Sequence, residues 1–219
     1  EARLDAVLEH VLGRRLVAVE QEPLVVAAAE PALVLSNRAD AAGLEFAASH
    51  GVETAVVDHK PFGKDREAFE HALDARLRES GVELVCLAGF MRLLTPWFVE
   101  QWRDRLINIH PSLLPSFKGL HTHERALEIG VRLHGCTVHF VRAEMDDGPI
   151  IVQGDVPVLP GDTADSLGVR VLGGENHNYP LAVRLVAESR ARVNGNAENV
   201  DQPPRERDGS ANINVVHPA

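Results

Sequence analysis

The chain has few of the features that mark secreted or membrane proteins. It has 219 residues but only two cysteines, Cys86 and Cys136, which disfavours a disulfide-stabilised scaffold. Both lie in apolar, strand-like runs, so we expect two buried thiols in a reducing compartment. No apolar run approaches the ~18 residues that a membrane helix needs. The first residues also lack a basic stretch before an apolar one, so we expect no signal peptide and a cytoplasmic location.

An excess of positive charge is also missing. The sequence has 22 lysines and arginines against 32 acidic residues, for a net charge of -10. This balance argues against broad binding to nucleic acid or to an anionic membrane, although a small basic pocket remains compatible with it. The hydrophobic fraction of 45% is ordinary for a globular protein that buries a core. We therefore expect small molecules as partners, with no nucleic-acid or membrane partner.

Hydrophobic periodicity predicts an α/β fold. After a helix at 2–14 and a candidate strand at 24–26, short apolar strands alternate with amphipathic helices. The strands are expected at 32–35, 54–57, 84–88 and 106–110, and the helices at 39–50, 65–80 and 96–103. This alternation is typical of a doubly wound, mostly parallel sheet.

The second half of the chain predicts a different arrangement. A helix at 122–129 precedes an antiparallel pair of strands at 136–141 and 149–156. Two helices follow, at 163–172 and 180–187, with Gly173 and Gly174 expected to separate them. We divide the chain into an atypical N-terminal segment (1–31), one α/β domain (32–193) and a flexible C-terminal tail (194–219).

The most informative segment is the strand at 106–110. Asn108 and His110 are two residues apart, so a strand projects both side chains to the same face, and Pro111 ends the strand directly after them. An amide can donate a hydrogen bond to a developing oxyanion, and an imidazole can transfer a proton. This pair suits acyl transfer. In a doubly wound sheet it would also lie at the carboxyl end of a strand, where ligands bind.

Several longer motifs occur in order around this pair: 36–40 (SNRAD), 88–92 (AGFMR), 108–115 (NIHPSLLP), 118–123 (KGLHTH), 134–141 (HGCTVHFV) and 146–151 (DDGPII). Together they resemble the folate-dependent formyltransferase family, over about residues 32–193. Within the family the resemblance is strongest to the branch that acts on glycinamide ribonucleotide. It implies transfer of a formyl group from the co-substrate 10-formyltetrahydrofolate to the amine of that ribonucleotide, in purine biosynthesis.

The resemblance also implies roles for individual residues. The family's essential trio matches Asn108 as the oxyanion donor, His110 as the proton shuttle and Asp146 as the carboxylate that orients the histidine; Asp147 is adjacent, and only the family match selects Asp146. Positions matched to folate contacts are Arg66, Met91, Arg92, Leu93, Leu94, Val141, Arg142 and Glu144. Positions matched to the acceptor substrate are Met91, Pro111 and Glu175. A homodimer is compatible with the family.

Histidines at 121, 123, 134 and 139 raise the alternative of a metal site. No cysteine or acid at suitable spacing completes a tetrahedral set, and the match is to a motif that binds no metal, so we expect none.

The N-terminal segment departs from the family. Family members begin with a strand and a Ser-Gly-x-Gly-Ser-Asn loop that holds the substrate phosphate with backbone N–H groups. Here the first 40 residues contain one glycine, Gly13. Three explanations stay open: another local element replaces the loop, acceptor binding is impaired, or the recorded sequence is wrong at its ends. Two alternative functions therefore remain, a formyltetrahydrofolate hydrolase with water as acceptor and a non-catalytic folate-binding protein.

Overall fold

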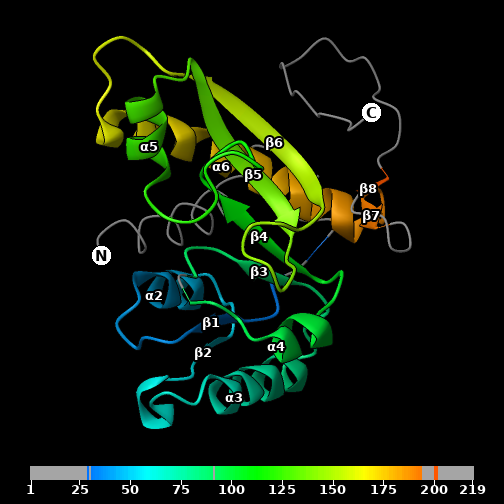
Figure 1. The fold of residues 1–219 in the computed structure, drawn as a ribbon. Coiled ribbons are helices and arrows are strands. Elements are labelled where there is room, and N and C mark those ends of the chain that lie inside the picture. Colours follow the sequence, from blue (N-terminus) through cyan, green and yellow to red (C-terminus); the bar gives the residue numbers. More distant parts are fainter. Residues whose placement is uncertain (1–28, 30, 91, 194–199, 202–219) are drawn as a thin grey trace. The chain divides into compact units, whose positions relative to one another are not determined.

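The computed structural model describes residues 29, 31–90, 92–193 and 200–201. The expected helix at 2–14, the candidate strand at 24–26 and nearly all of the expected tail at 194–219 lie outside the described residues. The chain divides into two compact units, Glu1–Leu106 and Ile107–Ala219. Figure 1 shows the helices and strands of both units.

The first unit contains strands and helices that alternate along the chain. Strand β1 (Val34–Ser36) pairs in parallel with β2 (Thr54–Val56), and helix α2 (Ala42–Ser49) connects them and packs against both. A further strand, β3 (Val85–Leu87), follows helix α3 (Arg66–Glu79). A helix that links two parallel strands is the repeating unit of a doubly wound sheet, which confirms the predicted α/β class.

Helix α3 forms where the sequence predicted it. The Asp65 side chain caps its first turn by accepting a hydrogen bond from the Ala68 backbone N–H at 2.9 Å. Phe69, Leu73 and Leu77 are spaced four residues apart, share one face and are buried. The short helices η1 (Lys60–Phe62) and α4 (Pro96–Gln101) flank α3 in the sequence, and α4 packs against it.

The second unit is built on antiparallel strands. Strand β4 (Leu106–His110) starts at the unit boundary and pairs with β5 (Leu133–Phe140), which pairs in turn with β6 (Ile150–Pro157). The predicted antiparallel pair is thus confirmed. Helix α5 (Thr122–Ile129) has the predicted bounds, and the long helix α6 (Ala164–Ala187) packs on β5 and β6 (Figure 1). The short strands β7 (Arg192–Val193) and β8 (Val200–Asp201) pair at the end of the described residues.

The predicted break at Gly173 and Gly174 is wrong, because α6 is one continuous helix of 24 residues. Packing outweighs the poor helix propensity of glycine. A Cβ added to Gly174 would lie 3.6 Å from the Cys136 sulfur, so the helix runs close to β5 at this point. Val171 and Tyr179 are buried on either side. Neither α6 nor any other helix among the described residues is both long and apolar enough to cross a membrane.

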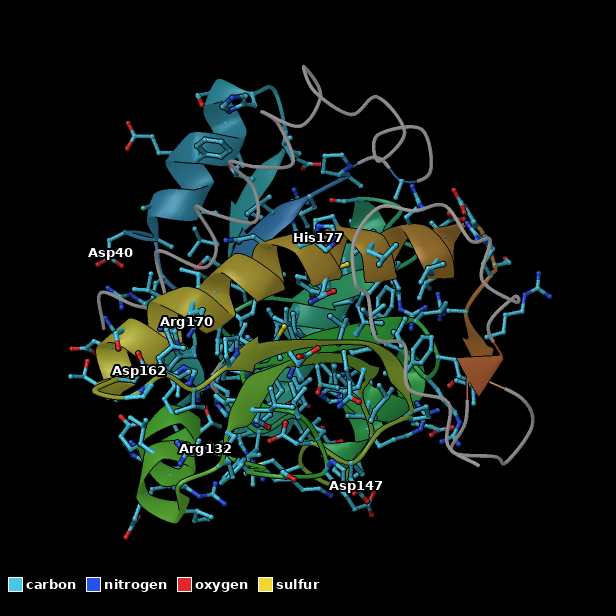
Figure 2. The ribbon with its side chains drawn as sticks, turned by 90° about the horizontal axis from the view of Figure 1, so that it is seen from above. Asp40, Arg132, Asp147, Asp162, Arg170 and His177 are labelled. Atoms are coloured by element: carbon cyan, nitrogen blue, oxygen red, sulfur yellow. The ribbon has the colours of Figure 1, made fainter. Side chains whose placement is uncertain are left out.

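The start of α6 is held by side chains. Thr163 and Ser166 form a reciprocal capping box, and Arg170 makes a bidentate ion pair with Asp162 at 2.7 and 2.9 Å (Figure 2). These contacts fix the point at which the chain leaves β6 and enters the helix.

The expectation of two buried thiols is half right. Cys136 is buried, accepts a hydrogen bond from the Asn178 amide at 3.6 Å, and its pKa is raised by burial to about 12. Cys86 is exposed. Within β3 only Val85 is buried, so the apolar run at 84–88 does not have both faces covered.

Strand β5 can accept no side chain at Gly135. An added Cβ would lie 2.0 Å from the Gly154 carbonyl oxygen on the paired strand. We expect Gly135→Ala to lower the free energy of unfolding by about 1–3 kcal/mol, because the backbones of β5 and β6 must move apart. Gly173→Ala is the matched control: no described atom lies within 4 Å of its added Cβ. In a helix interior this change should raise stability by roughly 0.5–1 kcal/mol. Urea unfolding measures the free energy of unfolding of both variants. Equal effects of the two substitutions would contradict the close approach of the β5 and β6 backbones at Gly135.

Candidate active site

Strand β4 places Asn108 and His110 beside each other. Both side chains project from the same face of the strand, and the strand ends at His110 as predicted. Their register partners on β5 are His139 opposite Asn108 and Thr137 opposite His110. Because directly opposed residues share a face of the sheet, these four polar side chains gather on one side of the second unit.

The His110 imidazole is buried, and each of its nitrogens faces an acceptor. Nε2 lies 3.0 Å from the Phe117 carbonyl oxygen, and Nδ1 lies 3.4 Å from the Oδ2 atom of Asp146. A carbonyl oxygen can only accept, so Nε2 carries a hydrogen and donates it. Nδ1 is consequently the nitrogen that faces the carboxylate, and the ring orientation is fixed from both sides.

The two adjacent acids of the β5–β6 loop have different partners. Asp146 has a left-handed backbone, with φ of 52°, and its Oδ2 atom also accepts a hydrogen bond from the Gly119 N–H at 2.8 Å. Asp147 is more exposed and pairs with Lys118. The geometry therefore brings Asp146, and not Asp147, against His110.

The end of this loop packs backbone against backbone. A Cβ added to Gly148 would lie 1.6 Å from the Phe140 carbonyl oxygen, and the Phe140 N–H donates to the Pro149 carbonyl at 2.9 Å. The two ends of the loop, at Phe140 and at Gly148–Pro149, are therefore held together by backbone contacts, which we call the closed base of the loop.

The sequence suggests His139 only as a candidate metal ligand, but the structure places its imidazole against the Asn108 amide. Its Nδ1 lies 2.9 Å from the Phe140 carbonyl oxygen and so carries the hydrogen. Nε2 is then free to accept from the Asn108 amide nitrogen, 3.5 Å away. Burial lowers the pKa of His139, with Asp146 acting in the opposite direction. A neutral His139 thus directs the amide nitrogen of Asn108.

Two of the other candidate metal ligands, His123 and His134, form a pair. His123 Nδ1 lies 3.1 Å from His134 Nε2, and burial lowers the pKa of His134 to about 4, with His123 adding to the effect. Across the ranges that the structure describes, no group of three or more His, Cys, Asp or Glu side chains is arranged to hold a metal ion.

The expected folate contacts lie on both units. In the first unit, Arg66 Nη1 lies 3.4 Å from the Leu93 carbonyl oxygen, which brings those two positions together. Arg92 lies 5.5 Å from the centre of the Phe69 ring, Leu94 follows in the same segment, and Met91 lies outside the described residues. In the second unit, Val141, Arg142 and Glu144 belong to the β5–β6 loop, with Arg142 donating to the Val141 carbonyl at 3.0 Å.

Two of the residues expected to contact the acceptor substrate, Pro111 and Glu175, are described by the structure, and both belong to the second unit. Pro111 directly follows β4, and Glu175 lies on α6 with 6% of its surface exposed. Burial raises the pKa of Glu175 to about 7. A carboxyl with this pKa can change its charge near neutral pH.

Sequence reasoning missed two buried residues near His110. Thr137 lies opposite His110 on β5, and Gln153 lies opposite Thr137 on β6. A weak signal was present, since each is a polar residue next to apolar ones in its strand. Their meaning depends on strand register, which the sequence did not provide.

Comparison with known proteins finds relatives of similar sequence and fold. A family model described as formyl transferase matches residues 10–183. The phosphoribosylglycinamide formyltransferase of Escherichia coli (strain K12) is 45% identical over 168 residues, which cover 77% of this chain and 79% of that protein. The crystal structure of glycinamide ribonucleotide transformylase 1 from Symbiobacterium toebii superposes with a TM-score of 0.80 at 44% identity, covering 91% of this chain and 89% of that one.

Some relatives are much longer. The trifunctional purine biosynthetic protein adenosine-3 of Gallus gallus is 51% identical over 165 residues, or 75% of this chain, but the match spans only 16% of that protein's length.

The buried Glu175 gives a pH-dependent prediction. A carboxyl whose pKa rises from 4.5 to about 7 on folding stabilises the fold at low pH, and this contribution is lost as the pH rises through that window. Glu175→Gln cannot ionise, so above neutral pH it should be more stable than the wild type by on the order of 3 kcal/mol. Below about pH 4 the difference should vanish. Chemical denaturation at several pH values measures it, with the exposed Glu128→Gln as control. A difference that does not change with pH would contradict the prediction.

Proposed function

The chain belongs to the formyl transferase family, and on this premise we propose that it transfers a formyl group from 10-formyltetrahydrofolate to the amine of glycinamide ribonucleotide, a step of de novo purine biosynthesis. The observation that carries the proposal is the contact of His110 with Asp146 beside Asn108. The likeness to named glycinamide ribonucleotide enzymes supports the choice of acceptor. A binder of folate alone would have no need of all three groups.

His110 acts as the proton-transfer group. Its Nε2 is occupied by the Phe117 carbonyl, so Nδ1 takes up and releases the proton. Asp146 accepts from Nδ1 and stabilises the positive charge while the imidazole holds the additional proton. As the substrate amine forms its bond to the formyl carbon, the amine loses a proton, and the departing folate nitrogen gains one. General acid–base support of this kind contributes about 10²–10⁴-fold in rate.

Asn108 donates a hydrogen bond to the formyl oxygen as that oxygen gains negative charge. One hydrogen of its amide nitrogen points to His139, and the other is directed to the oxyanion. A single donor of this type is worth a factor of about 10²–10³ in kcat.

The remaining site residues bind the two substrates. Folate contacts are assigned to the segment at 91–94, to Arg66 and to the loop at 141–146. Pro111 and Glu175 belong to the acceptor side, with Glu175 accepting from the substrate amine. A homodimer remains part of the proposal.

A formyl-transfer assay with and without glycinamide ribonucleotide tests the function. We expect turnover of 10-formyltetrahydrofolate only when the ribonucleotide is present, because water is a poor competitor for a positioned amine. Formation of formylated ribonucleotide and of tetrahydrofolate is measured in parallel. Release of formate without the ribonucleotide would establish a hydrolase instead, and folate binding without turnover in either arm would establish a binding protein.

Two adjacent substitutions test the choice of acid. Asp146→Asn should lower kcat by at least ~100-fold, because the histidine loses its carboxylate. Asparagine tolerates the left-handed backbone, so the fold should persist. Asp147→Asn is the matched control and should retain activity within a factor of about 3, since its loss removes only an exposed ion pair with Lys118. Steady-state kinetics of the two variants measure the effect. Equal losses, or a larger loss for Asp147→Asn, would refute the assignment.

A further inference from the structure

A buried hydrogen-bond network crosses the sheet next to His110. Register places His110 on β4, Thr137 on β5 and Gln153 on β6 in one row. The Thr137 hydroxyl donates to the Ser112 carbonyl at 2.7 Å and accepts from the Leu114 N–H at 3.0 Å. Gln153 Nε2 lies 2.9 Å from the same hydroxyl oxygen and 2.8 Å from the Leu114 carbonyl oxygen.

Each hydrogen in this network has only one arrangement. The Ser112 and Leu114 carbonyls can only accept, so the hydroxyl hydrogen of Thr137 goes to Ser112 and the Gln153 amide must present its nitrogen. The hydroxyl then donates once and accepts twice, which exhausts its capacity. Thr137 is completely buried and Gln153 nearly so, and a buried network with every partner satisfied is rigid.

The network fixes the loop that follows His110. Its contacts hold both sides of the turn at 112–114, and Ser112 continues the connection by donating through its hydroxyl to the Ser116 carbonyl at 2.6 Å. The next residue, Phe117, supplies the carbonyl oxygen that holds His110 Nε2. The position of that oxygen therefore depends on the anchor at Thr137 and Gln153.

We propose that Gln153, acting through Thr137 and Leu114, is a positioning residue that keeps the His110 imidazole in its Nε2–H tautomer. Gln153 touches neither substrate in this role. It holds the loop so that the Phe117 carbonyl meets Nε2 and leaves Nδ1 for Asp146. The effect on catalysis rests on the proposed formyl transfer, whereas the effect on the tautomer does not.

Two substitutions remove hydrogen bonds of the network while the volume of the substituted side chain changes little. Gln153→Met keeps the chain length but loses both donated hydrogen bonds, and Thr137→Val keeps the shape but loses the hydroxyl. Each should lower kcat by about 10- to 100-fold, because a small displacement of a catalytic group is enough for such a loss. KM for both substrates should stay within about 3-fold. Nitrogen-15 NMR of the His110 ring, in its neutral form, should change from one tautomer to a mixture.

Two further variants separate positioning from stability. Thr137→Ser retains the hydroxyl and should return kcat to within about 3-fold of the wild type. Val138→Ala removes part of an equally buried side chain from the other face of β5, so it should lower the melting temperature and leave the tautomer unchanged.

If Gln153→Met fails to fold, the comparison of Thr137→Val with Thr137→Ser tests the positioning role in its place. A single Nε2–H tautomer in the variants that lack the network would overturn the proposal, even if their kcat falls. Absence of formyl transfer by the wild type would refute the function alone, since the NMR measurement still tests the positioning.

Discussion

The arrangement of the candidate site depends on the register between β4 and β5. This register sets His139 opposite Asn108 and Thr137 opposite His110. A slip of one residue would turn every side chain of a strand to the other face of the sheet. The amide would then lose its imidazole partner, and the loop after β4 would lose the hydroxyl that anchors it. Apolar residues that alternate with these polar ones, Ile107, Ile109 and Val138, are all buried, so the hydrophobic pattern itself enforces the register.

The site combines a rigid half with a half carried by a loop. Asn108 and His110 come from a strand that is hydrogen bonded along its length, whereas Asp146 comes from the connection between β5 and β6. Three contacts hold Asp146 in place: the Gly119 N–H and the imidazoles of His110 and His139. Its left-handed backbone turns the carboxylate toward the imidazole, and the following residue turns away to meet Lys118. Asp146 and Asp147 thus contact different partners because the backbone of Asp146 has an unusual φ angle.

The elements of the fold with strong local signals were predictable from the sequence. Helices with a clear start, such as the one capped by Asp65, and the strand that ends just before Pro111 have nearly the predicted bounds. Two expectations failed: α6 continues through Gly173 and Gly174, where packing on β5 outweighs local preference, and Cys86 is exposed. The choice of Asp146 came from family resemblance, since nothing local distinguishes it from Asp147. Thr137 and Gln153 could not be recognised, because partners 23 and 39 residues distant give them their meaning.

The closed base of the β5–β6 loop has a consequence for how such a protein can diversify. Phe140 and Gly148 meet backbone to backbone, and Asp146 is held by contacts outside the loop. Between these fixed points, Ala143, Glu144 and Met145 are exposed to solvent. Ala143 and Glu144 can be substituted without displacing the carboxylate, whereas Met145 lies close to Gly119, whose N–H donates to Asp146. Because Glu144 is an expected folate contact, its replacement would change ligand preference, while the position of Asp146 is set by contacts outside the loop.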